Sequence, residues 1–247
     1  MSAANQSAVA IVTGASRGIG ATIARRLVKD GFAVAVNYAS SPAEADKLVA
    51  ELTQAGGKAI AVQGDVSKVE DVRRLFETVE QQLGKVDVLV NNAGILKTAP
   101  LAQSSDELFA QTFAINVGGV FNTLREAATR LRAGGRIINF SSSVVALLQP
   151  TYAVYAATKA GVEAMTSVFA KELRGRDITV NAVAPGPTAT DLFLNGKPQE
   201  VVDRLAKLAP LERLGQPSDI ANTVAFLASP DGGWVNGQVL RANGGII

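Results

Sequence analysis

Short apolar runs alternate along the chain with longer stretches in which apolar positions recur every three or four residues. The runs are rich in Val, Ile and Ala and almost continuously apolar, which is typical of strands covered on both faces of a parallel sheet. They are Ala8–Thr13, Ala33–Asn37, Ala59–Gln63, Val86–Val90, Arg136–Phe140, Thr179–Ala184 and Gln238–Arg241. The helical stretches between them include Gly18–Lys29, Pro42–Ala55, Val69–Leu83, Thr112–Leu131, Tyr152–Arg174 and Pro217–Leu227.

This alternation predicts an α/β fold: a Rossmann-type, doubly wound parallel sheet of about seven strands with helices on both faces. We expect residues 1–247 to form a single dinucleotide-binding and catalytic domain, because no shift in composition marks a boundary. Segment Gly186–Leu211, which contains three prolines, breaks the alternation. Ligands of such sheets bind beyond the carboxyl ends of the strands, so we predict a substrate lid over residues 186–211, with a surface insertion as the alternative. Its apolar side chains, which could line a pocket or attach the lid, are Leu192, Phe193, Leu194, Val201 and Leu205.

Composition limits the chemistry. The 247 residues include no cysteine and no histidine, which excludes disulfides, thiol catalysis, a Ser-His-Asp triad and the usual zinc sites. Acid–base chemistry near neutral pH must then use Tyr, Lys, Asp or Glu with a shifted pKa. A net charge of +2 without a basic cluster predicts neither a nucleic acid nor a membrane as partner. Residues 1–7 lack the features of a signal peptide, and we expect a cytoplasmic protein without a bound metal.

A glycine-rich turn joins the first predicted strand to the first predicted helix. Gly14, Gly18 and Gly20 permit a tight turn and close approach of a phosphate, although an ordinary strand-to-helix turn is the alternative. No carboxylate follows the second strand, where NAD-binding proteins place one for the ribose hydroxyl. The Arg17 guanidinium can instead pair with a 2′-phosphate. The sequence therefore favours NADP(H), unless Arg17 is merely solvated and Asn37 caps a turn.

A tyrosine and a lysine carry the predicted chemistry. Tyr155 and Lys159 are four residues apart in a helical stretch, and so share one face unless they are only an exposed pair. We expect the lysine to favour the ionised phenol and to lower the pKa of Tyr155 from its ordinary value of roughly 10. Ser142, just beyond the fifth predicted strand, is placed to donate to a carbonyl oxygen, although Ser141–Ser143 could simply form a loop. Together with the glycine turn, these residues predict hydride and proton transfer between a nicotinamide and a carbonyl.

With these motifs in this order, the chain resembles the short-chain dehydrogenase/reductases over nearly its whole length. The matching motifs are Thr13-Gly14-x3-Gly18-x-Gly20, Asn91-Asn92-Ala93-Gly94, Asn116, Ser142, Tyr155-x3-Lys159 and Pro185-Gly186. Within the family, the chain is most similar to the 3-oxoacyl-[acyl-carrier-protein] reductase group and its broad relatives. Members of the family are commonly tetramers, so the resemblance also implies a homotetramer.

The resemblance implies a role for each matched residue. Tyr155 would be the general acid in reduction, Lys159 would lower its pKa and bind the nicotinamide ribose, and Ser142 would orient the carbonyl oxygen. Asn116 would hold a water in a relay to Lys159. The cofactor contacts that it implies, together with those expected from the glycine turn, are Gly14, Ser16, Arg17, Gly18, Ile19, Gly20, Asn37, Ser40, Asp65, Val66, Asn92, Ala93, Gly94, Tyr155, Lys159, Pro185, Gly186, Thr188 and Thr190.

The sequence thus predicts an NADPH-dependent reductase of a ketone or 3-oxoacyl carbonyl, acting on a small molecule that is free or carried on a protein. One alternative is an NAD-linked alcohol or sugar dehydrogenase, which the missing acid after the second strand disfavours. Another is a nucleotide-sensing regulator without turnover. The full set of Asn116, Ser142, Tyr155 and Lys159 argues against a regulator, because a binding protein does not need a proton relay.

Overall fold

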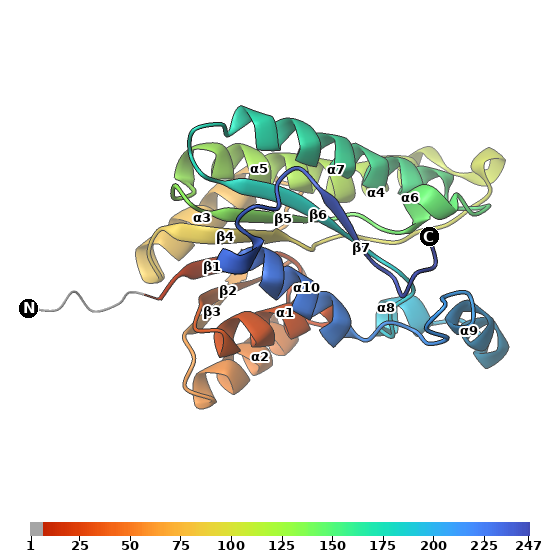
Figure 1. The fold of residues 1–247 in the computed structure, drawn as a ribbon, viewed down its shortest axis with the longest axis horizontal. Coiled ribbons are helices and arrows are strands. Elements are labelled where there is room, and N and C mark those ends of the chain that lie inside the picture. The colour runs from red at the N-terminus through yellow and green to blue at the C-terminus, as the bar shows by residue number, and fades with distance from the viewer. Residues whose placement is uncertain (1–6) are drawn as a thin grey trace, which may run out of the picture.

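The computed structural model describes residues 7–247, apart from the side chain of Leu192. The expectation for the first residues therefore lies mostly outside the described part, as does the proposed lining role of Leu192. Seven parallel strands form one sheet in the order β3-β2-β1-β4-β5-β6-β7, between two layers of helices (Figure 1). This confirms the predicted Rossmann-type, doubly wound sheet. Within the described residues, no helix has the length and apolar character needed to cross a membrane.

The strands are β1 Val9–Val12, β2 Ala33–Tyr38, β3 Ala59–Gln63, β4 Val86–Asn91, β5 Arg136–Phe140, β6 Thr179–Pro185 and β7 Val239–Ala242. The helices are α1 Gly18–Lys29, α2 Pro42–Gln54, α3 Val69–Gln82, α4 Asp106–Phe113, α5 Gly119–Arg130, α6 Val144–Leu147, α7 Ala153–Glu172, α8 Asp191–Leu194, α9 Gln199–Ala206 and α10 Pro217–Ala228. The predicted strands agree with these to within about one residue at each end, a normal uncertainty for element boundaries.

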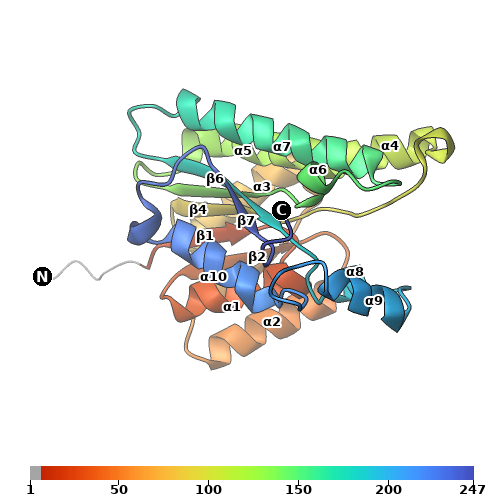
Figure 2. The same ribbon diagram turned by 45° about the vertical axis from the view of Figure 1, so that its right-hand side comes forward.

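Each face of the sheet is covered by three long helices. Helices α3, α5 and α7 lie on one face, and α1, α2 and α10 lie on the other (Figures 1 and 2). Strand β1 shows how the sequence supplies both layers: Val9 and Ile11 join the first core, whereas Ala10 and Val12 join the second. Side chains of a strand alternate between faces, so a strand buried on both sides needs continuous apolar sequence.

The strand order reverses between β1 and β4, because the chain crosses from β3 at one edge back to β4 beside β1. Loops that leave the carboxyl ends of these two strands therefore diverge, and the opening between them is where ligands bind in such sheets. Helices α8 and α9 lie at the same end of the sheet (Figure 2). The fold thus brings the glycine turn, the loop after β4 and the segment after β6 to one edge.

The predicted helix Thr112–Leu131 is wrong in its extent. Helix α4 begins earlier, where the Ser105 hydroxyl accepts a hydrogen bond from the backbone N–H of Leu108. The helix then passes through a π-helical turn, Ala114–Gly118, before α5 begins. Such turns insert an extra residue into the helix and are frequent at functional sites. An apolar period alone gives no sign of this extra residue.

Candidate active site

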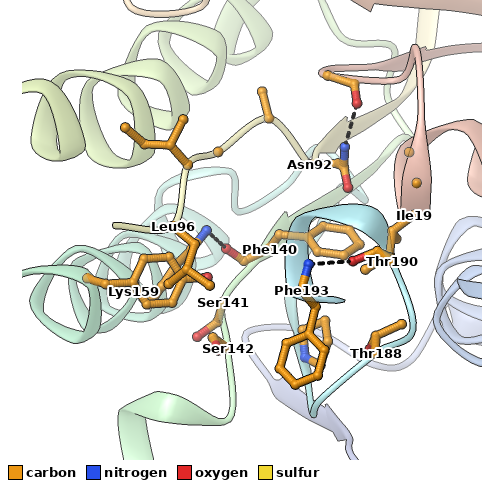
Figure 3. Close-up of a pocket in the computed structure, with 18 of the residues that line it drawn as sticks. Ile19, Asn92, Leu96, Phe140, Ser141, Ser142, Lys159, Thr188, Thr190 and Phe193 are labelled. Atoms are coloured by element: carbon orange, nitrogen blue, oxygen red, sulfur yellow. Dashed lines mark hydrogen bonds between the residues drawn. The ribbon is translucent and has the colours of Figure 1, made fainter. Parts of the chain in front are cut away.

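A cavity of about 540 Å³ runs along the carboxyl ends of the strands. Every cofactor contact expected from the sequence lines it, as do Ser142, Tyr155 and Lys159, whereas Asn116 does not. Lys159, Leu96 and Ser142 lie across the cavity from Thr190 and Phe193 (Figure 3). The fold therefore brings together residues from Gly14 to Ile246, nearly the whole length of the chain, and the cavity has a nucleotide end and a catalytic end.

The glycine turn is shaped for close approach. Gly14 has φ +60°, and a Cβ there would lie 2.9 Å from the Cα of Ala93. A Cβ on Gly20 would lie 2.5 Å from the side-chain nitrogen of Asn92. Helix α1 begins at Gly18 without a side-chain cap and without an acidic residue in its first turn, so its N–H groups face the cavity unneutralised. These features fit the pyrophosphate of a dinucleotide.

Two asparagines predicted as cofactor contacts also hold the glycine turn in place. The Asn37 amide donates to the carbonyls of Val62 and Gly64, at 3.2 and 3.0 Å, and its oxygen lies 3.4 Å from the backbone nitrogen of Gly14. The Asn92 amide donates to the carbonyls of Thr13 and Gly14, at 2.9 and 3.0 Å. Both residues line the cavity, but their amide hydrogens are already used by the backbone.

The far part of the nucleotide end carries one exposed cation. Arg17 lines the cavity beside Ser16 and Ser40, and within residues 7–247 no carboxylate forms an ion pair with it. Asp65 lies in the loop after β3. One of its carboxylate oxygens accepts hydrogen bonds from the backbone N–H and the hydroxyl of Ser67, at 2.9 and 2.7 Å. Val66, next to it, is buried against Gly119. Arg17 is thus free to meet an anionic group.

The catalytic end contradicts one expectation. Burial raises the pKa of Tyr155 to about 12; the Ser142 hydroxyl lowers it in part, and the nearby Tyr152 raises it slightly. Burial also lowers the pKa of Lys159 to about 8. The Lys159 ammonium donates to the carbonyl of Phe140 at 2.8 Å and lies 5.7 Å from the centre of the Tyr155 ring (Figure 3). The pKa of the phenol is therefore set by its burial, which outweighs the hydrogen bond from Ser142, and not by Lys159.

A raised pKa keeps the Tyr155 phenol protonated at neutral pH. The group is therefore ready to give a proton to an oxygen that gains negative charge, whereas accepting a proton would need its ionised form. Ser142, which faces the phenol, offers a second hydroxyl to the same oxygen. The arrangement fits general-acid chemistry at a carbonyl.

Asn116 has different partners from those implied by the resemblance. Its oxygen accepts from the backbone N–H of Ile95 at 2.9 Å, and its amide donates to the Ile95 carbonyl and the Thr158 hydroxyl, at 3.0 and 3.2 Å. The side chain is fully buried in the π-helical turn. It fastens the loop after β4 to the residue that precedes Lys159. Only a remaining lone pair on its oxygen could accept from a water, so the relay stays a prediction.

Both threonine hydroxyls of the loop after β6 form hydrogen bonds within the loop or with the helix that follows it. The buried Thr188 hydroxyl donates to the Gly186 carbonyl at 2.9 Å. The Thr190 hydroxyl accepts from the Phe193 N–H at 3.3 Å and caps α8 (Figure 3). These contacts hold the loop along the cavity, which Pro185, Gly186, Pro187, Thr188 and Thr190 line.

Sequence reasoning missed most residues at the mouth of the catalytic end. Apolar side chains from separate loops line it, with Gln149 and Tyr152 as polar neighbours. They are Leu96, Val144, Leu147, Phe193, Leu205, Leu208 and Ile246. Of these, only Phe193 and Leu205 were candidates in the sequence, because the others lie in loops or in the single turn of α6, which are too short to show a period or motif. Within the described residues, no group of three or more His, Cys, Asp or Glu side chains is arranged to hold a metal ion.

A family model described as enoyl-(acyl carrier protein) reductase matches residues 14–247. A short-chain dehydrogenase from Burkholderia cenocepacia, solved in complex with NADP, superposes with a TM-score of 0.92 at 36% identity, over 98% of both chains. The chain belongs to the short-chain dehydrogenase/reductase family. An NADPH-dependent aldehyde reductase-like protein of Arabidopsis thaliana is 44% identical over 97% of this chain and 94% of its own. A 3-oxoacyl-[acyl-carrier-protein] reductase of Staphylococcus epidermidis is 43% identical over 96% of this chain and 98% of its own.

Membership in this family makes the protein an oxidoreductase that uses a nicotinamide cofactor and acts on CH–OH or C=O groups. The likeness to the 3-oxoacyl-[acyl-carrier-protein] reductases is confirmed, although an aldehyde reductase-like protein is just as similar. The glycine turn and the uncapped start of α1 fit such a cofactor. Fold and family do not fix the substrate, because one fold carries many chemistries.

Proposed function

We propose that this short-chain dehydrogenase/reductase uses NADPH to reduce the carbonyl of a ketone, a 3-oxoacyl group or an aldehyde, with Tyr155 as proton donor. The observation that carries this proposal is the convergence of Tyr155, Ser142 and Lys159 at one end of a cavity whose other end holds the glycine turn. The cofactor, when bound, supplies a hydride to the carbonyl carbon.

The residues of the chain then handle the oxygen. Ser142 donates a hydrogen bond to it, and the Tyr155 O–H bond breaks as its proton passes to the forming alkoxide. Donors that meet charge where it develops are the usual source of rate in such steps. The phenolate left behind recovers a proton from Lys159 or, through it, from solvent. Because the pKa of Tyr155 lies far above neutrality, the phenol enters this step in its protonated form, which reduction requires.

Several features support NADP over NAD. Arg17 is exposed at the nucleotide end, and Ser40 and Ser41 line the same region. Strand β2 ends in Asn37-Tyr38, and no carboxylate stands there to accept from a ribose hydroxyl. A guanidinium and hydroxyls suit a 2′-phosphate, which a carboxylate would repel. The NADP-bound relative and the NADPH-dependent relative point to the same choice.

We propose an apolar carbonyl compound as substrate, free or attached to a carrier. The mouth of the catalytic end is lined by apolar side chains, and Phe193, Leu205 and Leu208 come from the segment predicted as a lid. This supports the lid role of residues 186–211. An alkyl or aryl group gains free energy by leaving water for such a surface. The absence of cysteine supports a reducing compartment, and the cytoplasm is the one we propose.

We further propose the homotetramer. Its support is the exposure of large apolar side chains on separate elements: Phe109 on α4, Phe121 on α5, and Trp234, which is 99% exposed, before β7. We take these side chains as candidate contact points between copies of the chain, where association would remove their apolar surface from water. Light scattering on the purified protein tests it, with a mass four times the 25.6 kDa of one chain as the expected result.

The activity is tested by titrating the purified protein with NADPH and NADH and then following nicotinamide absorbance with a panel of carbonyl compounds. The panel contains aliphatic and aromatic aldehydes, simple ketones and 3-oxoacyl thioesters. We expect tighter binding of NADPH and its oxidation by at least one apolar carbonyl. Tight NADPH binding with no turnover would favour the regulator instead, and a preference for NADH would favour the dehydrogenase.

A further inference from the structure

Four consecutive residues at the end of β5 each meet helix α7. The Asn139 amide donates to the Thr166 hydroxyl at 2.9 Å, and the Phe140 carbonyl accepts from Lys159 at 2.8 Å. The Ser141 hydroxyl donates to the Glu163 carboxylate at 2.6 Å. Ser142, the fourth, faces the Tyr155 phenol. Figure 3 shows Phe140, Ser141 and Ser142 in succession beside Lys159. Strand and helix are thus joined residue by residue at the catalytic end.

Glu163 is the one ionisable residue of this set that the proposed mechanism does not use. It follows Lys159 by four residues and Tyr155 by eight, so the three side chains lie along one stripe of α7. Among the described residues no Lys or Arg forms an ion pair with it. Its partner is the hydroxyl of Ser141, a residue only 3% exposed. A distance of 2.6 Å is typical of a hydroxyl bound to an ionised carboxylate, which is among the stronger kinds of hydrogen bond.

Ser141 stands between the two points where the strand end meets the catalytic groups. Its backbone N–H donates to the Val183 carbonyl at 2.8 Å, which fixes the backbone on the β6 side. Its side chain fixes the α7 side. Any rotation of the Ser141 backbone would carry with it the Phe140 carbonyl, which holds Lys159, and the Ser142 hydroxyl. Displacements well below 1 Å in such groups reduce rates strongly, because proton and hydride transfer need close alignment.

We propose that Glu163 is a positioning residue, which holds Ser141 and through it sets Ser142 and Lys159 in the geometry that carbonyl reduction needs. This role rests on the proposed function. Glu163 touches neither cofactor nor substrate, so its loss should slow the chemical step and leave cofactor binding unchanged.

The test compares Glu163→Ala, Glu163→Gln, Ser141→Ala and the double variant Ser141→Ala/Glu163→Ala, with the carbonyl compound that the panel identifies. We expect each alanine variant to lose on the order of tenfold in kcat. The double variant should be no worse than either single one, because both changes break one contact. Glu163→Gln keeps an oxygen acceptor for the serine and should stay within about threefold of the wild type. Glu172→Ala, an exposed glutamate at the end of the same helix, is the matched control and should change nothing.

Two further readouts separate positioning from a general loss of structure. The dissociation constant for NADPH should stay within about twofold, and the isotope effect with deuterated NADPH should rise as hydride transfer becomes more rate-limiting. Wild-type kcat in both alanine variants would overturn the role of Glu163, as would additive losses in the double variant or a tenfold loss in Glu163→Gln. A wild-type protein that reduces no carbonyl would instead overturn the proposed function, and this role with it.

Discussion

The two ends of the cavity differ in what forms their surface: mainly backbone at the nucleotide end and side chains at the catalytic end. At the nucleotide end, the backbone makes the surface. Its glycines leave room for a close approach of the ligand, and the side-chain amides of Asn37 and Asn92 bind backbone carbonyls and hold the turn in place. At the catalytic end, side chains of α7 make the surface, and the end of β5 holds them in place. The first end is a shape that admits phosphate, and the second is a set of aligned donors.

The difference matters for electrostatics. The nucleotide end keeps the guanidinium of Arg17 exposed to water. The catalytic end buries Lys159 to 4% exposure. Burial is the main reason why the pKa of Lys159 is lowered and that of Tyr155 raised, and both shifts favour the neutral form of the group. Binding at the first end should therefore tolerate single substitutions better than the chemistry at the second. Four predictions, together with the Glu163 variants, test this contrast.

The largest effect is expected from Tyr155→Phe. Removing the proposed proton donor should lower kcat by about a thousandfold, within the range of general-acid catalysis. NADPH affinity and the melting temperature should stay near wild type, since the ring remains in its pocket. Tyr152→Phe is the matched control, because its ring lies 6.4 Å from that of Tyr155 in an edge-on arrangement. Steady-state kinetics with the best carbonyl checks this, and a variant with more than a tenth of wild-type kcat would contradict the assigned role.

Lys159→Met should separate activity from stability. The pKa of Lys159 is lowered from 10.5 to about 8 in the fold. Below pH 8 the buried lysine is charged, and this charge lowers the free energy of unfolding. Between pH 8 and 10.5 the folded lysine is neutral while the unfolded one is still charged, so wild-type stability rises with pH there. After the lost hydrogen bond to Phe140 is counted, we expect the variant to be more stable by about 1–2 kcal/mol at pH 7. This gain should shrink to nothing or reverse by about pH 10.5.

Denaturant unfolding across pH measures that difference, and kcat of the variant should fall at least a hundredfold. Above pH 10 the raised pKa of Tyr155 acts in the opposite sense in both proteins, because the folded state then holds a proton that the unfolded state loses. The comparison is therefore read between pH 7 and 10. A variant less stable than wild type at pH 7 would show that the Phe140 contact outweighs the burial of the charge.

The features that could be predicted from the sequence are those that depend on local backbone rules, and the features that could not are those that depend on the finished fold. Apolar runs gave all seven strands, and glycine spacing gave the nucleotide end, because both depend on backbone rules that hold locally. Tyr155 and Lys159 were found because helical spacing is also local. The pKa of Tyr155 was not, since it depends on how deeply the finished fold buries the group. The π-helical turn at Asn116 and the Ser141–Glu163 contact were missed for a similar reason: each depends on residues that meet only in three dimensions.

Arg17→Ala tests the nucleotide end, where a smaller effect is expected. Loss of the guanidinium should weaken NADPH binding by about tenfold, as expected for one exposed charge-assisted contact, and leave NADH binding nearly unchanged. The preference for NADPH should also fall as salt is raised, since the charge is exposed. Fluorescence titration with each nucleotide checks both points, with Arg26→Ala as control, because that arginine lies on the same helix and pairs with Asp30. Equal weakening for both nucleotides would mean that Arg17 binds the pyrophosphate or supports the turn.

The smallest effect concerns the mouth of the catalytic end, where Gln149 stands among apolar side chains. It lies between Leu148 and Thr151, which have φ of +47° and +73°, a conformation that costs non-glycine residues free energy and is often kept at functional sites. No described residue forms a hydrogen bond with its carboxamide, so the group is available to a second polar atom of the substrate. One such hydrogen bond contributes about 1 kcal/mol.

Gln149→Leu, which keeps the side-chain volume, should therefore raise KM about fivefold for a carbonyl compound that carries a second oxygen, such as a 3-oxo ester. For a simple aldehyde of the same length it should leave KM unchanged or lower it slightly, since the mouth becomes wholly apolar. The ratio of the two KM values is the measurement, because any general disturbance of the loop affects both substrates alike. Equal changes for both would mean that Gln149 only shapes the loop, and the specificity of this end would then rest on its apolar lining alone.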